Sequence, residues 1–360
     1  MESSLVLEDG TVVRGASFGA PVKAFGELVF NTNMTGYTEA LTDPSYRGQI
    51  LLMTYPLIGN YGVDPAWMES DEIQVTGFVV REACAAPSHA RSQKAVGPFL
   101  DEYGVPGLQG ADTRDLTIRI RSRGTMKAAL VPGGEDLRAA AKEVRTMPYP
   151  DRRNLVAEVS CRKPVRYPGA GKRTLVVVDC GVKRNILREA QRFADVVRVP
   201  WDTPADDILA LKPSGVIVSN GPGDPAHPDL ARTTVPAVRE LADRVPLLGI
   251  CLGHQIIALA FGAKTFKLKF GHRGGNQPVK DLRTGRVHIT SQNHGFAVDA
   301  DSLDPSEFEV THLNLNDRTV EGIVHRTRPV FSVQYHPEAH PGPRDNEYIF
   351  REFVAQLRES

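Results

Sequence analysis

The sequence predicts an α/β fold, with an N-terminal mixed β/α domain followed by an open, mostly parallel-sheet domain. Three observations support this class. A chain of 360 residues has room for two domains of roughly 150 residues each. With 41% hydrophobic and 24% charged residues, it has the composition of a globular protein that buries a full core in each domain. After about residue 173, turn-separated strands give way to apolar strands that alternate with helices, which is typical of a parallel sheet covered on both faces.

The N-terminal domain is predicted over residues 1–150 from β-rich runs separated by turns. The runs 5–7 and 11–13 flank Asp9-Gly10, a dipeptide that favours the tight turn of a β-hairpin. The remaining elements are expected as strands at 28–31, 50–53 and 75–80, and as amphipathic helices at 110–122 and 137–146.

A stretch rich in proline, arginine and glycine at 151–172 is predicted to be a linker, and the second domain is predicted over 173–360. After residue 263 the pattern indicates short strands. Ligands bind such sheets at the carboxyl ends of the strands, so the functional site is expected there. Strands are expected at 175–178, 195–199, 215–219 and 245–250, and helices from about 183 and at 205–211, 230–242 and 254–261. A last helix is expected at 346–357, after the short strands.

Composition argues against nucleic-acid and membrane partners. The 43 basic and 43 acidic side chains cancel, and the isoelectric point is near 7.2, so no electrostatic footprint for nucleic acid or an anionic membrane is present. No window reaches the roughly 18 uninterrupted apolar residues of a membrane span, and the N-terminus lacks the pattern of a secretory signal. The four cysteines form no C-x-x-C pair, so neither a disulfide framework nor a zinc ribbon is expected. We therefore expect a cytoplasmic globular protein.

Cys251 is the candidate nucleophile. It lies in Gly249-Ile-Cys-Leu-Gly253, between a predicted strand and a predicted helix, which is the setting of a nucleophile elbow with sulfur in place of a serine hydroxyl. Glycines are needed because a neighbouring Cβ would clash in this tight turn. The helix N-terminus stabilises negative charge on the sulfur and directs backbone N–H groups at a developing oxyanion. The alternative role, a cysteine that only fills space in the core, is the one we expect for Cys84, Cys161 and Cys180.

His336 is the candidate general base and acid. It follows the last strong strand pattern, in Val330-Phe-Ser-Val-Gln-Tyr-His-Pro-Glu338, so a strand end places it at the same edge of the sheet as Cys251. Glu338 is two residues further on and is positioned to accept the second imidazole N–H and hold the tautomer. Taken alone, the pair also fits a surface histidine beside a solvated glutamate. Together with the cysteine elbow, it predicts a Cys-His-Glu triad.

Ser219-Asn-Gly-Pro-Gly-Asp-Pro225 is a third motif at a strand end. Its glycines allow backbone N–H groups to approach a ligand, and its prolines delay the helix that a bound pyrophosphate would need. We therefore expect an oxyanion or substrate-backbone role for Gly223 rather than nucleotide binding. The Ala170–Arg173 segment lacks the upstream glycine of a P-loop, and His336-Pro-Glu338 lacks the Pro-Cys-x-x-Cys partner of a zinc deaminase. No metal site is expected.

The Gly249–Gln255 and His336–Glu338 motifs resemble those of the class I (triad) glutamine amidotransferases. Other motifs narrow the resemblance, which covers nearly the whole chain, to the small, glutaminase chain of carbamoyl-phosphate synthases. The chain departs from that pattern at Cys180, Gln277 and His340, where an aromatic residue, histidine and serine are common. The narrowing motifs are Asn31-Thr-Asn-Met-Thr-Gly-Tyr37, Leu41-Thr-Asp-Pro-Ser-Tyr46, Lys183-Arg-Asn-Ile-Leu187, Ser219–Pro225, Phe270-Gly-His-Arg-Gly-Gly-Asn276 and Gln292-Asn-His-Gly-Phe296.

The resemblance implies hydrolysis of L-glutamine to glutamate and ammonia through a glutamyl thioester. It implies a partner, the carbamoyl-phosphate synthase large subunit, which makes carbamoyl phosphate from bicarbonate and ATP for arginine and pyrimidine synthesis; the holoenzyme is then a ligase. No cofactor is expected in this chain, because ATP, Mg²⁺ and bicarbonate are expected on the large subunit. The glutamine site is implied at Ser45, Gly221, Gly223, Leu252, Gln255, Asn293, Gly295 and Phe296.

Two other functions stay open from the residues. One is a different hydrolase on the same elbow, such as a gamma-glutamyl peptide hydrolase, which would work alone and would not need the N-terminal domain. The other is a non-catalytic scaffold or regulatory subunit, which the loss of a triad residue would have favoured, whereas all three are present. The N-terminal domain has no catalytic constellation of its own, so we expect it to supply much of the surface that docks the large subunit.

Overall fold

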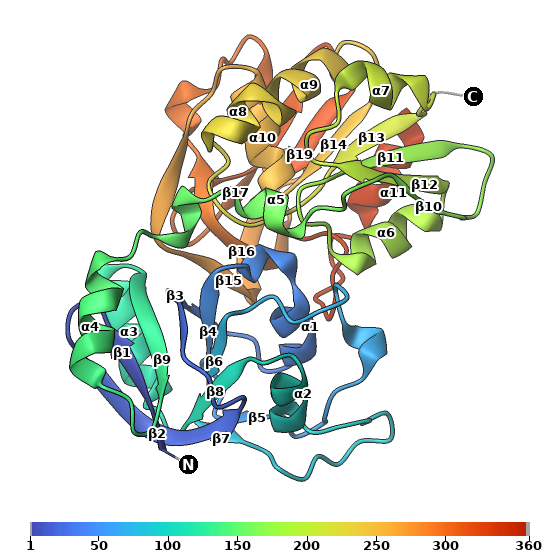
Figure 1. The fold of residues 1–360 in the computed structure, drawn as a ribbon. Helices are drawn as coiled ribbons and strands as arrows, with labels where there is room; N and C mark the ends of the chain where they lie inside the picture. Colours follow the sequence, from blue (N-terminus) through green and yellow to red (C-terminus); the bar gives the residue numbers. More distant parts are fainter. Residues whose placement is uncertain (1, 358–360) are drawn as a thin grey trace. The chain divides into compact units, whose positions relative to one another are not determined.

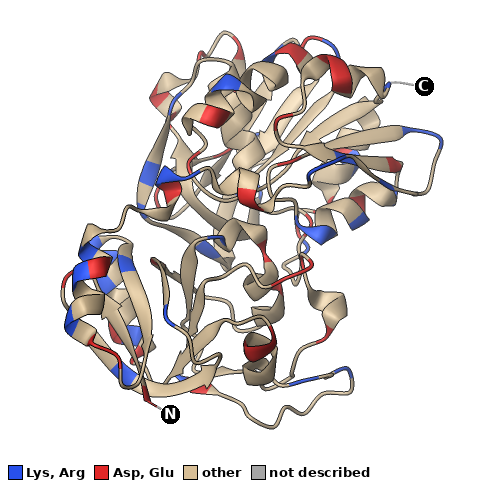
Figure 2. Cartoon of the chain, in the orientation of Figure 1, with Lys and Arg blue, Asp and Glu red and all other residues tan. Residues whose placement is uncertain are grey.

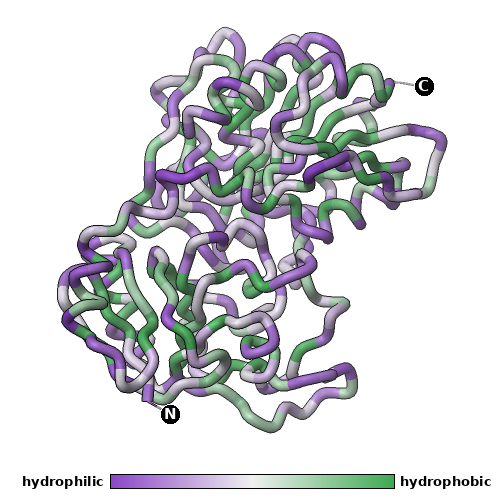
Figure 3. Tube along the Cα trace, viewed as in Figure 1, coloured by the Kyte–Doolittle hydropathy of each residue, from purple (hydrophilic) through white to green (hydrophobic). Residues whose placement is uncertain are grey.

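The computed structural model describes residues 2–357 and forms two compact units, Met1–Arg152 and Arg153–Ser360 (Figure 1). In each unit the hydrophobic residues follow the inner strands (Figure 3), and charged residues of both signs are spread over the helices and loops (Figure 2). All four cysteines are free thiols. Within residues 2–357, none of the helices has the length and apolar character needed to traverse a bilayer.

The stretch 151–172, expected to be a linker, contains regular structure. It holds the helix α5 (Leu155–Val159) and the strand β10 (Val165–Tyr167), and β10 pairs antiparallel with β12 (Asp195–Pro200) of the second unit. The prolines that suggested a linker lie at positions 164 and 168, directly before and after β10, where proline is compatible with an edge strand. Most of the expected linker therefore belongs to the second unit.

The first unit is built on a closed barrel with the strand order β1-β2-β8-β6-β4-β3-β9. The predicted hairpin is present, since Val6 pairs with Val12 across the Asp9-Gly10 turn. Closure into a barrel was not predicted, because it depends on pairing between strands that are distant in the chain. The strands of the barrel are β1 (Glu2–Leu7), β2 (Val12–Gly19), β3 (Ala24–Asn31), β4 (Gln49–Met53), β6 (Gly77–Val79), β8 (Pro106–Gln109) and β9 (Met126–Pro132).

Both predicted helices of the first unit are present as α3 (Thr113–Arg123) and α4 (Leu137–Thr146). The carboxylate of Asp112 caps α3 by accepting the N–H of Asp115 at 2.9 Å, and Leu116 and Ile120 are buried on one face of the helix. The other elements of this unit are α1 (Tyr37–Thr42), η1 (Pro44–Tyr46), β5 (Leu57–Ile58), η2 (Pro65–Trp67), β7 (Glu82–Ala83), α2 (Val96–Glu102) and η3 (Pro150–Arg152).

The second unit contains a 10-stranded sheet with the order β10-β12-β11-β13-β14-β19-β18-β17-β15-β16. The strands β12, β11, β13, β14 and β19 run parallel to one another, and β18, β17, β15 and β16 extend the sheet in antiparallel pairings. The predicted α/β class is thus confirmed. The bounds are β11 (Thr174–Asp179), β13 (Gly215–Val218), β14 (Leu247–Ile250), β15 (Thr265–Asp281), β16 (Val287–Val298), β17 (Phe308–Asn314), β18 (Val320–His325) and β19 (Val330–Val333).

Alternate side chains of the parallel strands bury two cores, one on each face of the sheet. On β11, Val176 packs in the cluster that contains Ile256 of α10, whereas Val177 packs in the cluster that contains Ile186 of α6 and Phe350 of α11. The near-continuous apolar strands follow from this burial on both faces (Figure 1). The remaining elements are α6 (Arg184–Gln191), α7 (Ala205–Ala210), α8 (Pro228–Arg232), α9 (Thr234–Leu241), α10 (Leu252–Ala260), η4 (Ala300–Ser302) and α11 (Tyr348–Gln356).

The helix expected at 230–242 is two helices, α8 and α9, separated at Thr233. Pro236 explains the break. In one continuous helix its ring would clash with the carbonyl group four residues earlier, whereas in α9 it falls in the first turn, where no intrahelical N–H is required.

The prediction of short strands after residue 263 is wrong for the first two strands, because β15 has 17 residues and β16 has 12. Their antiparallel pairing is interrupted by register shifts between Lys267 and His272 and between Gly274 and Gln277. Gly271 and Gly274, which suggest strand ends in the sequence, have positive φ of 71° and 148° and lie at these irregularities. They bend a long ribbon rather than end it.

Candidate active site

Cys251 occupies the turn between β14 and α10. Its φ of 55° and ψ of −104° are unusual for a residue with a side chain, and such strain is concentrated at functional sites. The backbone N–H of Cys251 donates to the carbonyl oxygen of Val333, at the end of the neighbouring strand β19, over 2.9 Å. The residue is 1% exposed. The chain therefore forms the strand–turn–helix elbow that the sequence predicts, with the cysteine at the carboxyl end of its strand.

The two glycines of the elbow leave no room for side chains. A Cβ on Gly249 would lie 2.7 Å from the carbonyl oxygen of Gly253, and a Cβ on Gly253 would lie 2.0 Å from the carbonyl oxygen of Val218. Both obstacles are backbone atoms, which cannot rotate away. Glycine at these positions lets α10 pack directly against β13.

Gly253→Ala is expected to destabilise the second unit by about 1–3 kcal/mol, since the added methyl group forces the start of α10 away from β13. The matched control is Gly97→Ala in α2, where an added Cβ has nothing nearer than 3.9 Å and should be neutral or stabilising by about 0.5–1 kcal/mol. Thermal unfolding, with hydrogen exchange of α10 as the local probe, measures both. Equal behaviour of the two variants would contradict the steric role of Gly253.

The His336 imidazole lies beside the Cys251 thiol. The thiol contributes to raising the pKa of His336, while Sγ itself donates to the carbonyl oxygen of Asn293 over 3.6 Å. Within residues 2–357, Nε2 of His336 has no partner in hydrogen-bond alignment. The contact between thiol and imidazole is therefore loose, as is common for catalytic hydrogen bonds without substrate.

The carboxylate of Glu338 is shared by two cationic side chains. Its Oε1 lies 2.7 Å from Nδ1 of His336 and 2.9 Å from Nζ of Lys183, and the Lys183 and Glu338 side chains are 5% and 0% exposed. The amide of Asn185 donates to the backbone carbonyl oxygen of Glu338 over 2.6 Å. Lys183 and Asn185 lie at the start of α6, shortly after the end of β11, whereas Glu338 lies shortly after the end of β19. Their contacts therefore connect the ends of these two strands.

These contacts set the charges of the site. Burial is the largest single influence on the pKa of His336 and acts to lower it, as does Lys183, but the charge and hydrogen bond of Glu338 together with the Cys251 thiol raise this pKa to about 10. Burial acts to raise the pKa of Glu338, but Lys183 and His336 hold it well below its usual range. At neutral pH the imidazole is therefore protonated and the carboxylate ionised.

The 219–225 loop lies against the elbow. The carbonyl oxygen of Ser219 accepts the N–H of Gly253 over 3.0 Å, and a Cβ on Gly221 would lie 1.9 Å from the carbonyl oxygen of Cys180 and 2.8 Å from Leu252. Gly223 has a φ of 89°, a conformation that side chains rarely adopt. Crowding therefore explains Gly221 and the positive φ explains Gly223, and the loop brings its main chain to the same edge of the sheet.

The middle of β16 forms the side of the site beyond Cys251. Gln255, on the first turn of α10, donates from Nε2 to the carbonyl oxygen of Phe296 over 2.7 Å and to Oε1 of Gln334 over 2.9 Å. Asn293 accepts from the Cys251 thiol. Gly295 lies between Asn293 and Phe296 on this strand. These bonds hold β16 against the nucleophile elbow.

The second unit thus brings together at one sheet edge every predicted site residue except Ser45. Ser45 belongs to η1 of the first unit, where its N–H donates to Oδ1 of Asp43 over 2.9 Å, and its glutamine contact stays a prediction. The predicted residues of the second unit are Cys251, His336, Glu338, Gly221, Gly223, Leu252, Gln255, Asn293, Gly295 and Phe296.

Three residues of the site were given no role from sequence. Lys183 and Asn185 hold Glu338, and Gln334 holds Gln255. Lys183 and Asn185 follow the strand end of β11, so the rule that strand ends carry function points to them. Gln334 directly follows β19, two residues before His336, and its inward amide gives no local sequence signal.

Known proteins match the chain over its whole length. Residues 176–356 match the glutamine amidotransferase class-I family, and residues 5–130 match the carbamoyl-phosphate synthase small chain, CPSase domain. The carbamoyl phosphate synthase small chain of Methanopyrus kandleri is 55% identical over 364 residues, covering 100% of both chains. That of Archaeoglobus fulgidus is 53% identical over 360 residues, covering 100% of this chain and 99% of the relative. That of Methanosarcina acetivorans is 52% identical over 359 residues, covering 97% of each.

The two matches agree with the two units. The small-chain domain match lies within the barrel unit, and the amidotransferase match covers the sheet that carries Cys251, His336 and Glu338. Full-length identity above one half extends the agreement to the barrel, which an amidotransferase domain alone does not require. The chain therefore belongs to the family of carbamoyl phosphate synthase small chains, the glutamine-hydrolysing subunits of that enzyme, and its second unit is a class-I glutamine amidotransferase domain.

Proposed function

We propose that this chain hydrolyses L-glutamine at Cys251, His336 and Glu338 and delivers the ammonia to a carbamoyl-phosphate synthase large subunit. The observation that carries the proposal is the Cys251 elbow beside a His336–Glu338 pair joined over 2.7 Å, in a chain of this family. A buried thiol at a helix N-terminus, next to a protonated imidazole, is the arrangement that a cysteine nucleophile needs.

In the first step, Cys251 attacks the side-chain carboxamide carbon of glutamine as the thiolate of a thiolate–imidazolium pair, in which His336 holds the proton that the thiol has lost. A carbon–sulfur bond forms, and the carbonyl oxygen becomes an oxyanion. The N–H of Leu252, the first residue of α10, and the N–H of Gly223 are the proposed donors to this oxygen. Because both are backbone groups held by the elbow and by the 219–225 loop, they are in place before the charge develops.

In the second step, His336 donates its proton to the departing nitrogen, and the carbon–nitrogen bond breaks to release ammonia and leave a glutamyl thioester. His336, now neutral, takes a proton from water, which attacks the thioester and releases glutamate and the Cys251 sulfur. Glu338 stays ionised and keeps Nδ1 of His336 oriented. The sum is glutamine plus water giving glutamate plus ammonia.

Ammonia released into water would be protonated and would lose its nucleophilicity. The product therefore passes to the large subunit by a shielded route, and the large subunit carries ATP, Mg²⁺ and bicarbonate and forms carbamoyl phosphate. This chain then serves arginine and pyrimidine synthesis in the cytoplasm, as the glutaminase half of a heterodimeric ligase. The barrel unit is the proposed docking surface, since the residues proposed for the thioester chemistry lie in the second unit.

Trapping the thioester tests the chemistry. When the chain is mixed with glutamine, quenched in acid and mapped by mass spectrometry, a glutamyl adduct is expected on the Cys251 peptide. Cys180 supplies the comparison, because burial and the neighbouring Asp179 raise the pKa of its thiol well above the usual value. An adduct on Cys180, or turnover of glutamine in a Cys251→Ser variant, would show that the nucleophile is assigned incorrectly.

A further inference from the structure

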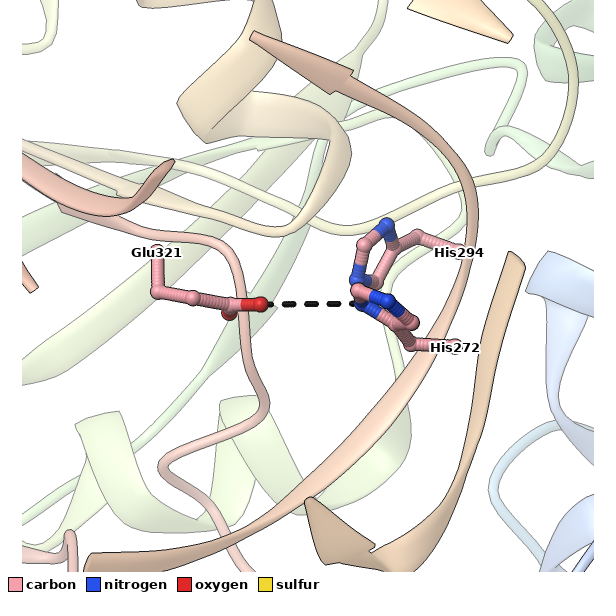
Figure 4. A group of neighbouring side chains, drawn as sticks. All are labelled: His272, His294 and Glu321. Carbon is pink, nitrogen blue, oxygen red and sulfur yellow. Dashed lines mark ion pairs between the residues drawn. The ribbon is translucent and has the colours of Figure 1, made fainter. Parts of the chain in front are cut away.

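A second cluster of polar side chains lies in the antiparallel part of the sheet, on β15, β16 and β18. His272, His294 and Glu321 each offer one ligand atom, and these three atoms lie within 4.8 Å of one another (Figure 4). The residues are 6%, 6% and 0% exposed. Two imidazoles and a carboxylate, all buried, form a donor set that divalent transition metals prefer.

In each imidazole, the ring nitrogen that is not one of the clustered ligand atoms already has a hydrogen-bond partner. Nε2 of His272 lies 2.8 Å from Oδ2 of Asp317, and Nδ1 of His294 lies 2.7 Å from the carbonyl oxygen of Phe296. Both outer partners are acceptors, so each ring carries its proton on the outer nitrogen. Nδ1 of His272 and Nε2 of His294 then present lone pairs toward Glu321. Metal-binding histidines have this arrangement, with the far N–H bound to a carboxylate or a backbone carbonyl.

Gln292 presents another acceptor to His294. The hydroxyl of Thr290 donates to the carbonyl oxygen of Gln277 over 2.9 Å, so it accepts from Nε2 of Gln292 at 3.0 Å. The same Nε2 donates to Oε2 of Glu321 over 2.9 Å. These two bonds fix the amide, and its Oε1 is left facing Nε2 of His294 at 3.0 Å. Two acceptors therefore face each other with no proton between them.

The same conflict exists at His272. Its Nδ1 has no hydrogen-bond partner among the described residues, and its nearest charged neighbour is Oε1 of Glu321 at 3.6 Å, beyond a normal hydrogen bond. A second proton on His272 would face the Glu321 carboxylate, but it would leave the Nε2–Oε1 pair of His294 and Gln292 unresolved. A cation placed among the inward atoms satisfies all of them.

We propose that this cluster is a structural zinc site, in which Nδ1 of His272, Nε2 of His294 and Glu321 bind one Zn²⁺, with Oε1 of Gln292 as the fourth ligand. Zn–N and Zn–O bonds of about 2.0–2.1 Å place neighbouring ligand atoms of a tetrahedral site about 3.3 Å apart. The pairs at 3.0 and 3.6 Å are close to this spacing. The three ligand atoms named first all lie within 4.8 Å of one another, so small rotations of the side chains bring them to this spacing.

The ion would join three strands immediately beside the proposed glutamine site. His294 lies between Asn293 and Gly295 on β16, and its outer nitrogen shares the Phe296 carbonyl oxygen with Gln255. Four protein ligands leave no open position, so the site is structural rather than catalytic. The proposal does not depend on the glutamine chemistry, because its readout is metal binding.

The test is zinc binding to the full chain after chelator treatment, by competition with a chromogenic chelator and by metal analysis. We expect one Zn²⁺ per chain for the wild type and no high-affinity zinc for Glu321→Gln and His294→Gln. The matched control is His312→Gln, which removes a similarly buried histidine of β17 whose nitrogens face Thr311 and Tyr348 and should keep the ion. Asp317→Asn, which changes the outer partner of His272 and leaves all four proposed ligands in place, should weaken binding about 10–100-fold.

Cobalt substitution separates this site from the cysteines. Co²⁺ in the wild-type protein should give a tetrahedral visible spectrum without a thiolate charge-transfer band. A thiolate band, equal zinc affinity in wild type and in the soluble, folded Asp317→Asn and Glu321→Gln variants, or no zinc in the wild type would each overturn the proposal. Asp317 has a partly exposed side chain, so its substitution tests the site even if a core variant fails to fold.

Discussion

Cys251→Ser is expected to abolish glutamine-dependent carbamoyl phosphate synthesis and leave ammonia-dependent synthesis intact, when the chain is assembled with a large subunit. A serine hydroxyl is a far weaker nucleophile than a thiolate, and without the thioester the attack on the carboxamide has no covalent route. We expect the glutamine-dependent rate to fall on the order of 10³-fold or more. Added ammonia bypasses this site, so the second rate reports that the complex is still assembled.

The matched control is Cys180→Ala, which removes the other thiol near a strand end without touching the triad. It should retain glutamine-dependent synthesis. If Cys251→Ser retains glutamine use, the triad assignment is wrong; if it loses ammonia-dependent synthesis as well, the substitution has damaged the complex and the glutamine rate must be measured with Cys251→Ala. Loss of glutamine use in Cys180→Ala alone would assign the nucleophile to the other cysteine.

The same assay separates the proposed function from a hydrolase that works alone. A subunit that feeds ammonia to a partner should hydrolyse glutamine at a rate that changes when the large subunit and its substrates are added. A solitary hydrolase would be insensitive to them. The barrel unit argues for the former, since the family match at residues 5–130 covers it and a solitary hydrolase on this elbow would not need it.

The elbow could be predicted because its constraints are local. Gly249 and Gly253 are close to Cys251 in sequence. Gly249 is required by a contact with the backbone of Gly253 within the strand–turn–helix unit, and Gly253 by the close approach of α10 to Val218 on β13. His336 could be placed because parallel strands bring their carboxyl ends to one edge, and β14 and β19 are neighbours. Local patterns and one rule of sheet topology were sufficient to bring Cys251, His336 and Glu338 to one edge of the sheet.

The less local features could not be predicted. Lys183 reaches Glu338 across 155 positions of sequence only because β11 and β19 end at the same edge. The His272–His294–Glu321 cluster forms only because bulges adjust the register of β15 and β16, and glycines at bulges resemble strand ends in a linear reading. The barrel closes through β1 and β9, which are paired although more than 100 residues apart.

The charges around Glu338 give Lys183 an expected role in the chemistry. Lys183 and the protonated His336 supply two positive charges, whereas Glu338 supplies one negative charge. A thiolate on Cys251 would make the buried group neutral. Without Lys183, the same thiolate would leave one uncompensated negative charge in a site from which water is largely excluded, and such a charge is costly.

Lys183→Met is therefore expected to destabilise the second unit by about 3 kcal/mol, the lower end of the range for breaking a buried ion pair, because His336 remains as a partner of Glu338. The pH dependence should change in a defined direction. The depressed pKa of Glu338 gives stability that is present above its unfolded pKa and lost as the pH falls through the folded value. Burial acts to raise this pKa, and Lys183 is the largest contributor to its depression, so the variant should lose stability and glutaminase activity at a higher pH on acidification than the wild type.

Lys23→Met is the matched control, because Lys23 forms an exposed ion pair with Glu143 at 3.1 Å, with side chains 32% and 55% exposed, and such pairs contribute about 0–1 kcal/mol. The comparison uses denaturant unfolding and the kcat and kcat/KM of glutamine hydrolysis, each measured from acid to neutral pH. Lys183→Arg should restore part of the lost stability and part of the lost activity. A purely structural Lys183 would lower stability and leave the acid limb of kcat/KM where it is in the wild type. A displaced acid limb in Lys183→Met, absent in Lys23→Met, means that Lys183 acts through the ionisation of Glu338, and hence through the orientation and charge of His336.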